Sequence, residues 1–167
     1  MNFVLAALLL GSGDFCMWPD RTDLYIYSQH YLGPHQDKYL VMAGDMWGRH
    51  IGIKFHTTRD PQKADITVCI GNPPGANVPR NRLATERDLG FTSTIYINPN
   101  KVRTTARKFG WLMCHEIGHS LGLSHCRSRI DMMYPDIEWS KRLTRNDVQR
   151  IRALYNKHPK TPKPHYC

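Results

Sequence analysis

The sequence predicts one α+β domain, and three observations lead to this prediction. The chain has 167 residues, of which 41% are hydrophobic and 22% charged, as in a globular domain large enough to bury a core. Apolar residues alternate in several short segments and recur every three or four positions in three longer ones. These segments follow the order strand, helix, several strands, helix and helix, which is typical of α+β proteins.

The first part of the chain predicts three strands and one helix. Residues 24–27 are rich in β-forming side chains and predict the first strand. A helix follows Gly33 and Pro34, because the next apolar residues share one helical face. The members of this face are Tyr39, Leu40, Ala43, Met46 and Trp47. Residues 51–55 and 64–70 alternate between apolar and polar side chains, as half-buried strands do.

The middle of the chain predicts the rest of the sheet. Residues 71–82 contain three prolines and two glycines and predict a loop. Residues 83–85 then predict a brief edge strand, and residues 92–98 predict a further strand that Pro99 ends. About five strands are therefore expected in total.

Two helices complete the predicted domain. Residues 104–123 form the first, with Thr104 or Thr105 as its N-cap and Gly122 in its C-terminal turn. Residues 144–155 form the second, with Thr144 as N-cap. The apolar stripe of this last helix consists of Val148, Ile151, Leu154 and Tyr155.

Both ends of the chain differ from the domain between them. Residues 1–10 are apolar and residues 11–13 are small, which predicts a secretory signal peptide at 1–13; a buried first strand or helix is the alternative. Residues 14–156 are then the folded domain, and residues 157–167, with three prolines and three lysines, are a basic tail. No apolar run is long enough to cross a bilayer as a helix.

The cysteine count indicates the cellular compartment, and the net charge limits the possible binding partners. Five cysteines, none in a Cys-x-x-Cys pair, favour a secreted protein with two disulfides and one remaining thiol, although a reduced intracellular protein stays an alternative. The net charge of +9 comes without a nucleic-acid-binding motif, so it predicts a basic surface and no nucleic-acid partner. We expect a monomer whose partner is a protein or peptide substrate.

The most informative residues lie between positions 115 and 125. His115 and His119 are four residues apart on the predicted helix, so both imidazoles leave one face about one turn apart. Glu116 follows the first histidine, and Gly122 lets the chain turn so that His125 can approach the other two. The spacing of two histidines suits nitrogen ligands of one zinc ion at roughly 2.0–2.1 Å.

This set of residues predicts a catalytic zinc site rather than a structural one. Three protein ligands, His115, His119 and His125, leave the fourth tetrahedral position for water, whose pKa zinc lowers to about 7. Glu116 is the expected general base for that water in the hydrolysis of a peptide bond. The predicted function is a zinc-dependent endopeptidase. The alternative is a weakly active or non-catalytic module that binds zinc and a peptide.

The same stretch resembles the elongated zinc motif of the metzincins, and within them most closely the matrixins. Residues 131–135 resemble the methionine turn of that family, and Met133 follows His125 by eight residues as it does there. Weaker similarity extends from about Trp18 to Tyr155. The resemblance implies a twisted, mostly parallel sheet with an antiparallel edge strand, an active-site helix, a methionine turn and a C-terminal helix.

Several departures from the matrixin pattern limit what the resemblance implies. Between residues 71 and 100 there is no histidine, and only Glu86 and Asp88 are acidic, so we predict no structural zinc and no secure calcium site. Cys126 follows the third histidine where matrixins usually have Ser, and Asn146 replaces the first of two helix aspartates. An astacin-like enzyme is disfavoured because Pro135 stands where that branch has a zinc-neighbouring Tyr.

The resemblance also suggests a specificity pocket and a disulfide. Trp111, Tyr134, Pro135 and Ile137 occupy positions that line the matrixin pocket for the side chain after the scissile bond, so a shallow apolar pocket is expected. The alternative for Trp111 is a position in the core between helix and sheet. In that family the N-terminal segment runs beside the last helix, and the tail of this chain leaves from the same helix. The resemblance therefore favours a Cys16–Cys167 bridge. The alternative is that Asp14 or Cys16 occupies the open zinc position and keeps the enzyme latent.

Overall fold

The computed structural model describes Asp14 and residues 16–31, 35–71, 81–87, 90–97, 106–136 and 142–156. Five strands and three α-helices are found in this part of the chain, with one short 3₁₀ helix, η1. The elements are β1 (Asp23–Ser28), α2 (Gln36–Gly48), β2 (Lys54–Thr58), η1 (Pro61–Lys63), β3 (Ile66–Ile70), β4 (Asn81–Arg87), β5 (Gly90–Ile97), α4 (Ala106–Ser120) and α5 (Arg145–Asn156).

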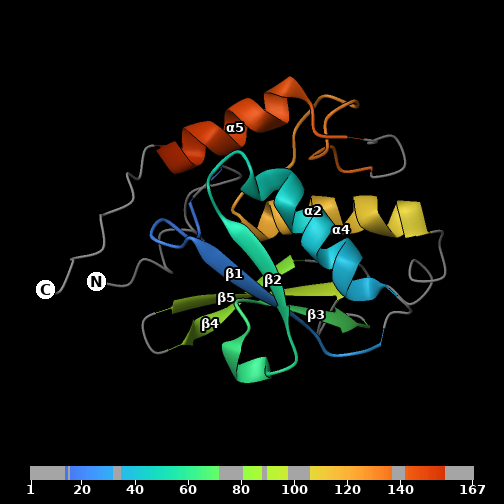
Figure 1. The fold of residues 1–167 in the computed structure, drawn as a ribbon. Helices are drawn as coiled ribbons and strands as arrows, with labels where there is room; N and C mark the ends of the chain where they lie inside the picture. Colours follow the sequence, from blue (N-terminus) through green and yellow to red (C-terminus); the bar gives the residue numbers. More distant parts are fainter. Residues whose placement is uncertain are drawn as a thin grey trace, which may run out of the picture.

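The five strands form one sheet in the order β2-β1-β3-β5-β4. The pairs β1–β2, β1–β3 and β3–β5 are parallel, whereas β4 is antiparallel to β5 and lies at the edge. The predicted α+β fold, with a mostly parallel sheet and an antiparallel edge strand, is confirmed. In Figure 1, α2 and α4 lie on the same side of the sheet, and α5 lies beyond them at the top of the view.

The core lies between the sheet and these helices. Because side chains alternate along a strand, each central strand points one apolar row toward α2 and α4. The fully buried members of these rows are Leu24, Ile26, Ile66, Val68, Ile95 and Ile97. Trp47 of α2 and Met113, Ile117 and Leu121 of the α4 region are equally buried. Helix α4 is therefore packed against both the sheet and a second helix, and it is held in a fixed position.

Three aromatic side chains from distant parts of the chain bind the backbone of α4. The indole Nε1 of Trp47 donates to the carbonyl of Cys114 at 2.7 Å, and that of Trp18 donates to Ser120 at 2.8 Å. The hydroxyl of Tyr155 donates to the carbonyl of Leu121 at 3.0 Å. Carbonyls at a helix C-terminus lack partners within the helix, so two of these contacts satisfy groups that would otherwise be buried without one.

The structure moves some predicted boundaries. The second strand begins at Lys54 rather than at residue 51, because the N–H groups of Ile51 and Ile53 donate to the carbonyl of Gly48 in a turn. Both isoleucines are nonetheless buried, as the alternation predicted. The predicted loop at 71–82 is too long at its end, since strand β4 includes Asn81 and Arg82.

The helix boundaries follow the predicted caps closely. Helix α4 ends at Ser120, before the predicted residue 123, and Gly122 then has a φ of 98°, the left-handed conformation expected of it. Thr144 caps α5 as predicted, because its Oγ1 accepts from the N–H of Asp147 at 3.2 Å. Thr104, Thr105, the segment 1–13 and the tail 157–167 lie outside the described residues.

Among the described helices, none is long and apolar enough to cross a membrane. The four described cysteines, Cys16, Cys69, Cys114 and Cys126, form no disulfide with one another. Cys167, the expected partner of Cys16, lies outside the described part of the chain.

Two glycines of α4 allow a matched test of its packing. A Cβ added at Gly118 would lie 2.4 Å from the Sδ of Met133 and 3.0 Å from Trp47, and both side chains are fully buried. A Cβ at Gly110 would meet no atom within 4 Å. We expect Gly118→Ala to destabilise the protein by about 1–3 kcal/mol through overpacking.

Gly110→Ala should instead stabilise the protein by up to about 1 kcal/mol, because alanine favours the helix. Urea unfolding of both variants without metal measures the difference. If Gly118→Ala were as stable as the wild type, the close contact between α4 and Met133 would be disproved.

Candidate metal centre

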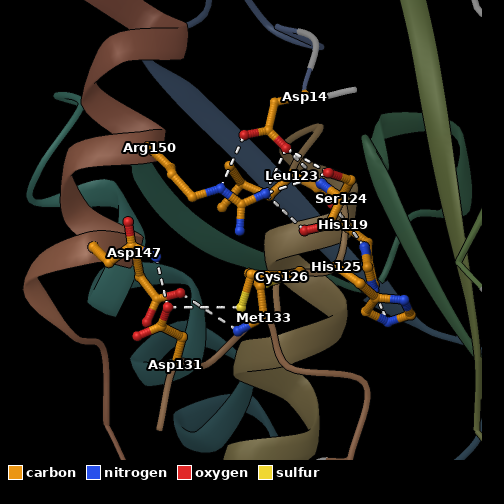
Figure 2. Close-up of polar contacts among 11 residues, drawn as sticks. Asp14, His119, Leu123, Ser124, His125, Cys126, Asp131, Met133, Asp147 and Arg150 are labelled. Carbon is orange, nitrogen blue, oxygen red and sulfur yellow. Dashed lines mark hydrogen bonds and ion pairs between the residues drawn. The ribbon is translucent and has the colours of Figure 1, made fainter. Parts of the chain in front are cut away.

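Three histidines meet at the C-terminal end of α4. His115 and His119 are on the helix, and His125 follows the turn at Gly122. The Nε2 atom of His119 lies 3.1 Å from the Nε2 atoms of both His115 and His125. One nitrogen from each ring lies within 4.8 Å of the other two, and Figure 2 shows the rings of His119 and His125 turned toward each other.

Hydrogen bonds to backbone carbonyls determine which nitrogen of two rings carries the proton. The Nδ1 of His115 lies 2.7 Å from the carbonyl oxygen of Met132, and the Nδ1 of His119 lies 2.7 Å from that of Leu123. A carbonyl oxygen can only accept, so in a neutral ring Nδ1 donates and Nε2 keeps its lone pair. Metal-binding histidines typically have such a partner on the other ring nitrogen.

Burial keeps these imidazoles neutral. It lowers the pKa of His115 to about 4 and that of His119 to about 3, and it also lowers the pKa of the more exposed His125. At neutral pH the Nε2 atoms of His115 and His119 are therefore two acceptors 3.1 Å apart with no proton between them. Two nitrogens bound to a tetrahedral zinc lie roughly 3.3 Å apart. The donor set fits a divalent cation, which would remove the repulsion between the lone pairs.

Glu116 lies beside this cluster in a buried position. The residue is 5% exposed, and burial raises the pKa of its carboxyl group from 4.5 to about 8. A carboxyl group with a pKa near neutrality is suited to accept and return a proton during a reaction. A cation bound by the neighbouring histidines would favour the ionised form.

The turn at residues 131–135 packs against α4 beside the helical histidines. Met133 is fully buried and lies against Gly118 of α4. Gly118 is located between the two helical histidines in the sequence. The N–H of Cys126 donates to the carbonyl of Met133 at 2.9 Å, which joins the segment after His125 to the turn. Met133 was expected here from the sequence. The orienting carbonyls of Met132 and Leu123 were not, because backbone groups leave no signal in a side-chain pattern.

A buried carboxylate on α5 supports the turn. Asp147 is fully buried and accepts hydrogen bonds from the N–H groups of Met132 at 2.8 Å and Thr144 at 2.9 Å, and a longer one from Met133 at 3.4 Å. Asn146 donates to Asp131 at 2.6 Å. The sequence had singled out Asp147 only as the remaining member of an aspartate pair; its position three residues after an N-cap Thr was the signal for a capping role.

Neither residue considered for latency reaches the three-histidine cluster. Asp14 instead binds Ser124 and Arg150, and Figure 2 shows it above these side chains. Cys16 is half-buried next to Tyr155, and burial raises the pKa of its thiol. These contacts place the N-terminal segment beside α5, as the family resemblance implied.

The expected pocket residues are only partly described. Trp111 lies on α4 one turn before His115 and is half-buried, as is Tyr134 of the methionine turn. Pro135 is exposed, and Ile137 lies outside the described residues.

The domain is α+β, and its helix and following turn bring three imidazoles together beside a buried glutamate. This is the donor set of a metalloprotein. The chain belongs to the matrixin family: the model of that family, described as Matrixin, matches residues 73–156, half of the chain. This stretch includes α4, the three histidines, the turn and α5.

Curated relatives match over shorter segments. The chain is 42% identical over 52 residues to interstitial collagenase B of Mus musculus, covering 29% of this chain and 11% of the relative. It is 48% identical over 48 residues to metalloendoproteinase 2-MMP of Arabidopsis thaliana, covering 27% and 13%. Stromelysin-2 of Rattus norvegicus is 40% identical over 50 residues, covering 27% and 10%. The matched segment thus spans about a tenth of the length of each relative.

Proposed function

We propose that this protein is a zinc-dependent endopeptidase in which His115, His119 and His125 hold the zinc and Glu116 is the general base. The convergence of three imidazole nitrogens, two of them with Nδ1 engaged by carbonyls, is the observation that carries the proposal. Membership of the matrixin family supports it. A single zinc is proposed, with no structural zinc and no calcium.

The side chains of the site divide the work of hydrolysis. The chemistry that zinc supplies there is Lewis acidity, which polarises a peptide carbonyl and makes water a stronger acid. Glu116 accepts a proton from the attacking water and later returns it to the nitrogen of the departing amine. The carbonyls of Met132 and Leu123 hold two of the imidazoles in the tautomer that leaves Nε2 free to bind metal.

The second candidate function is a non-catalytic module that binds zinc and a peptide. Glu116 favours the enzyme, because such a module has no use for a base at this position. Burial of an ionisable carboxyl also disfavours the folded state whenever the group is charged. That cost is expected where the group takes part in chemistry.

We base the proposed substrate preference on Trp111, a residue of α4. Trp111 is half-buried on α4 one turn before His115, which is compatible with a role in limiting the depth of such a pocket. With Tyr134, Pro135 and Ile137 as the other wall, the pocket should accept small or medium apolar side chains after the scissile bond. Selectivity should be modest, because one methylene in an apolar pocket changes binding by only about 1–3 kcal/mol.

The remaining features of the proposal concern location and organisation. We propose a secreted, monomeric enzyme acting on proteins or peptides, with a signal peptide at 1–13, a catalytic domain at 14–156 and a basic tail at 157–167. Its five cysteines and the matrixin relationship support secretion.

Removal of the metal tests the proposed function directly. Purified protein should contain one zinc per chain and cleave casein. A strong chelator should abolish cleavage, and added zinc should restore it, because the three histidines remain neutral and close together. The measurement is the release of casein fragments alongside zinc content by elemental analysis. Cleavage that persists in zinc-free protein would exclude a zinc peptidase, and stoichiometric zinc without cleavage would favour the binding module.

A further inference from the structure

We propose that Asp14 and Arg150 are positioning residues for His125, acting through the backbone of Ser124. The inference rests on the proposed function only in so far as the three histidines bind a metal. His125 is the ligand that most needs such support. It lies outside α4, it is exposed, and among the described residues its ring has no carbonyl partner like those of His115 and His119.

Asp14 and Arg150 bind both backbone groups of the residue before His125. The N–H of Ser124 donates to Oδ1 of Asp14 at 2.9 Å, and its hydroxyl donates to the same oxygen at 2.7 Å. The carbonyl of Ser124 accepts from Nη2 of Arg150 at 2.9 Å. That carbonyl belongs to the peptide bond joining Ser124 to His125, so its orientation determines where His125 leaves the chain.

The two charged residues also bind each other. Nη2 of Arg150 donates to Oδ1 of Asp14 at 2.6 Å, and Nε donates to Oδ2 at 3.1 Å, which makes a bidentate pair. The side chains are 19% and 24% exposed, so solvent weakens this pair less than a surface one. In Figure 2, Arg150 extends from α5 toward Ser124, and Asp14 approaches both from above.

Charge gives a second reason why the site needs Asp14. Arg150 binds the carbonyl of Ser124, the residue before His125, so its positive charge lies near that ring. The same charge opposes the binding of a cation by His125. Asp14 neutralises it at hydrogen-bond distance, so losing Asp14 would both free the Ser124 backbone and leave a positive charge near the metal.

The contacts of Arg150 leave one of its hydrogen-bond donors unused. Its Nη1 is buried and, among the described residues, has no hydrogen-bond partner. A buried donor without a partner costs about 1–3 kcal/mol. The guanidinium is therefore oriented to serve Asp14 and Ser124, as expected of a residue whose role is to hold the loop.

A double-mutant cycle on the full chain tests the inference. The variants are Asp14→Ala, Arg150→Ala and the double variant, with Asp20→Ala as the control, an exposed carboxylate of the same segment. Zinc affinity is measured by competition with a chromogenic chelator. We expect Asp14→Ala to weaken zinc binding about tenfold or more, as for other residues that orient metal ligands. Asp20→Ala should stay within twofold of the wild type, and the double variant should lose less than the sum of the two single losses.

A second measurement separates positioning from simple stabilisation. The absorption spectrum of the Co²⁺-substituted protein reports ligand geometry, and it should change in Asp14→Ala but not in Asp20→Ala. Asp14→Asn keeps an oxygen acceptor for Ser124 without the charge, so its zinc affinity should be intermediate; it also provides the comparison if Arg150→Ala fails to fold. Asp14→Ala with a lower unfolding temperature but wild-type zinc affinity and Co²⁺ spectrum would reduce the pair to a structural ion pair and overturn the inference.

The outcomes also distinguish this inference from the proposed function. Wild-type protein that binds zinc but cleaves no protein would contradict the peptidase, and the comparison of zinc affinities would still decide the role of Asp14. Wild-type protein that binds no zinc would contradict both.

Discussion

Replacing Glu116 by glutamine is expected to abolish most proteolysis while the protein keeps its zinc. Glutamine has nearly the same shape but cannot accept the proton of the attacking water. General acid–base catalysis of this kind contributes about 10²–10⁴-fold, so kcat should fall by that order. Zinc content should match the wild type, because Glu116 is not part of the cluster of three nitrogens. His119→Gln should lose both zinc and activity.

The measurement is casein cleavage with zinc content determined on the same samples. Asp37→Asn, which removes an exposed carboxylate in the first turn of α2, is the matched control and should cleave at the wild-type rate. Retention of activity by Glu116→Gln would show that another group accepts the proton.

The same substitution should change how stability depends on pH in the metal-free protein. Burial raises the pKa of Glu116 from 4.5 to about 8, so folded protein holds this proton more tightly than unfolded protein does. Its contribution to stability is complete below pH 4.5 and is lost as the pH rises through about 8. Glutamine removes this loss, so the unfolding temperature of Glu116→Gln should exceed that of the wild type increasingly between these two pH values.

Removing the carboxylate of Asp147 should cause the largest loss of stability. Asp147→Ala leaves the buried N–H group of Met132 and the half-buried N–H group of Thr144 without their acceptor, and it removes the N-terminal charge that favours α5. Buried donors left unsatisfied cost about 1–3 kcal/mol each, so a loss of at least about 3 kcal/mol is expected. Zinc binding should weaken as well, because the carbonyl of Met132 orients His115.

Asn146→Ala is the matched control for Asp147. Its side chain is exposed and donates one hydrogen bond, to Asp131, so its loss should cost roughly 1 kcal/mol. Urea unfolding of the metal-free proteins gives the comparison, and zinc competition gives the effect on the site. Equal unfolding midpoints for the two variants would mean that Asp147 does not hold the methionine turn.

How far the sequence predicts this molecule depends on whether a feature is local. The sequence pattern located every strand and α-helix of the described chain but missed η1. The left-handed turn at Gly122 and the N-cap at Thr144 were predicted correctly, because caps and left-handed glycines act over a few residues. The predicted start of β2, residue 51, was three residues before the observed start at Lys54. Buried Ile51 and Ile53 alternate like a strand, although their N–H groups bind the carbonyl of Gly48.

The candidate site divides in the same way. The three histidines and Glu116 lie within eleven consecutive residues, and their spacing predicted that the imidazoles would meet. The contacts around them join residues far apart in sequence: Asp14 binds Ser124, 110 residues later, and Asp147 binds Met132. Such pairs follow from the tertiary fold, and no local pattern contains them.

The aromatic contacts to α4 help to determine when, during folding, the three-histidine cluster can form. Trp18 and Trp47 reach the helix from 102 and 67 residues upstream, whereas Tyr155 reaches it from 34 residues downstream. Long-range contacts of this kind form late, because closing each loop costs chain entropy before the contact repays it. A chain still emerging from the ribosome has the three histidines before it has Tyr155, Arg150 and Asp147. The final geometry of the three-histidine cluster is therefore expected to form only after α5 has been synthesised.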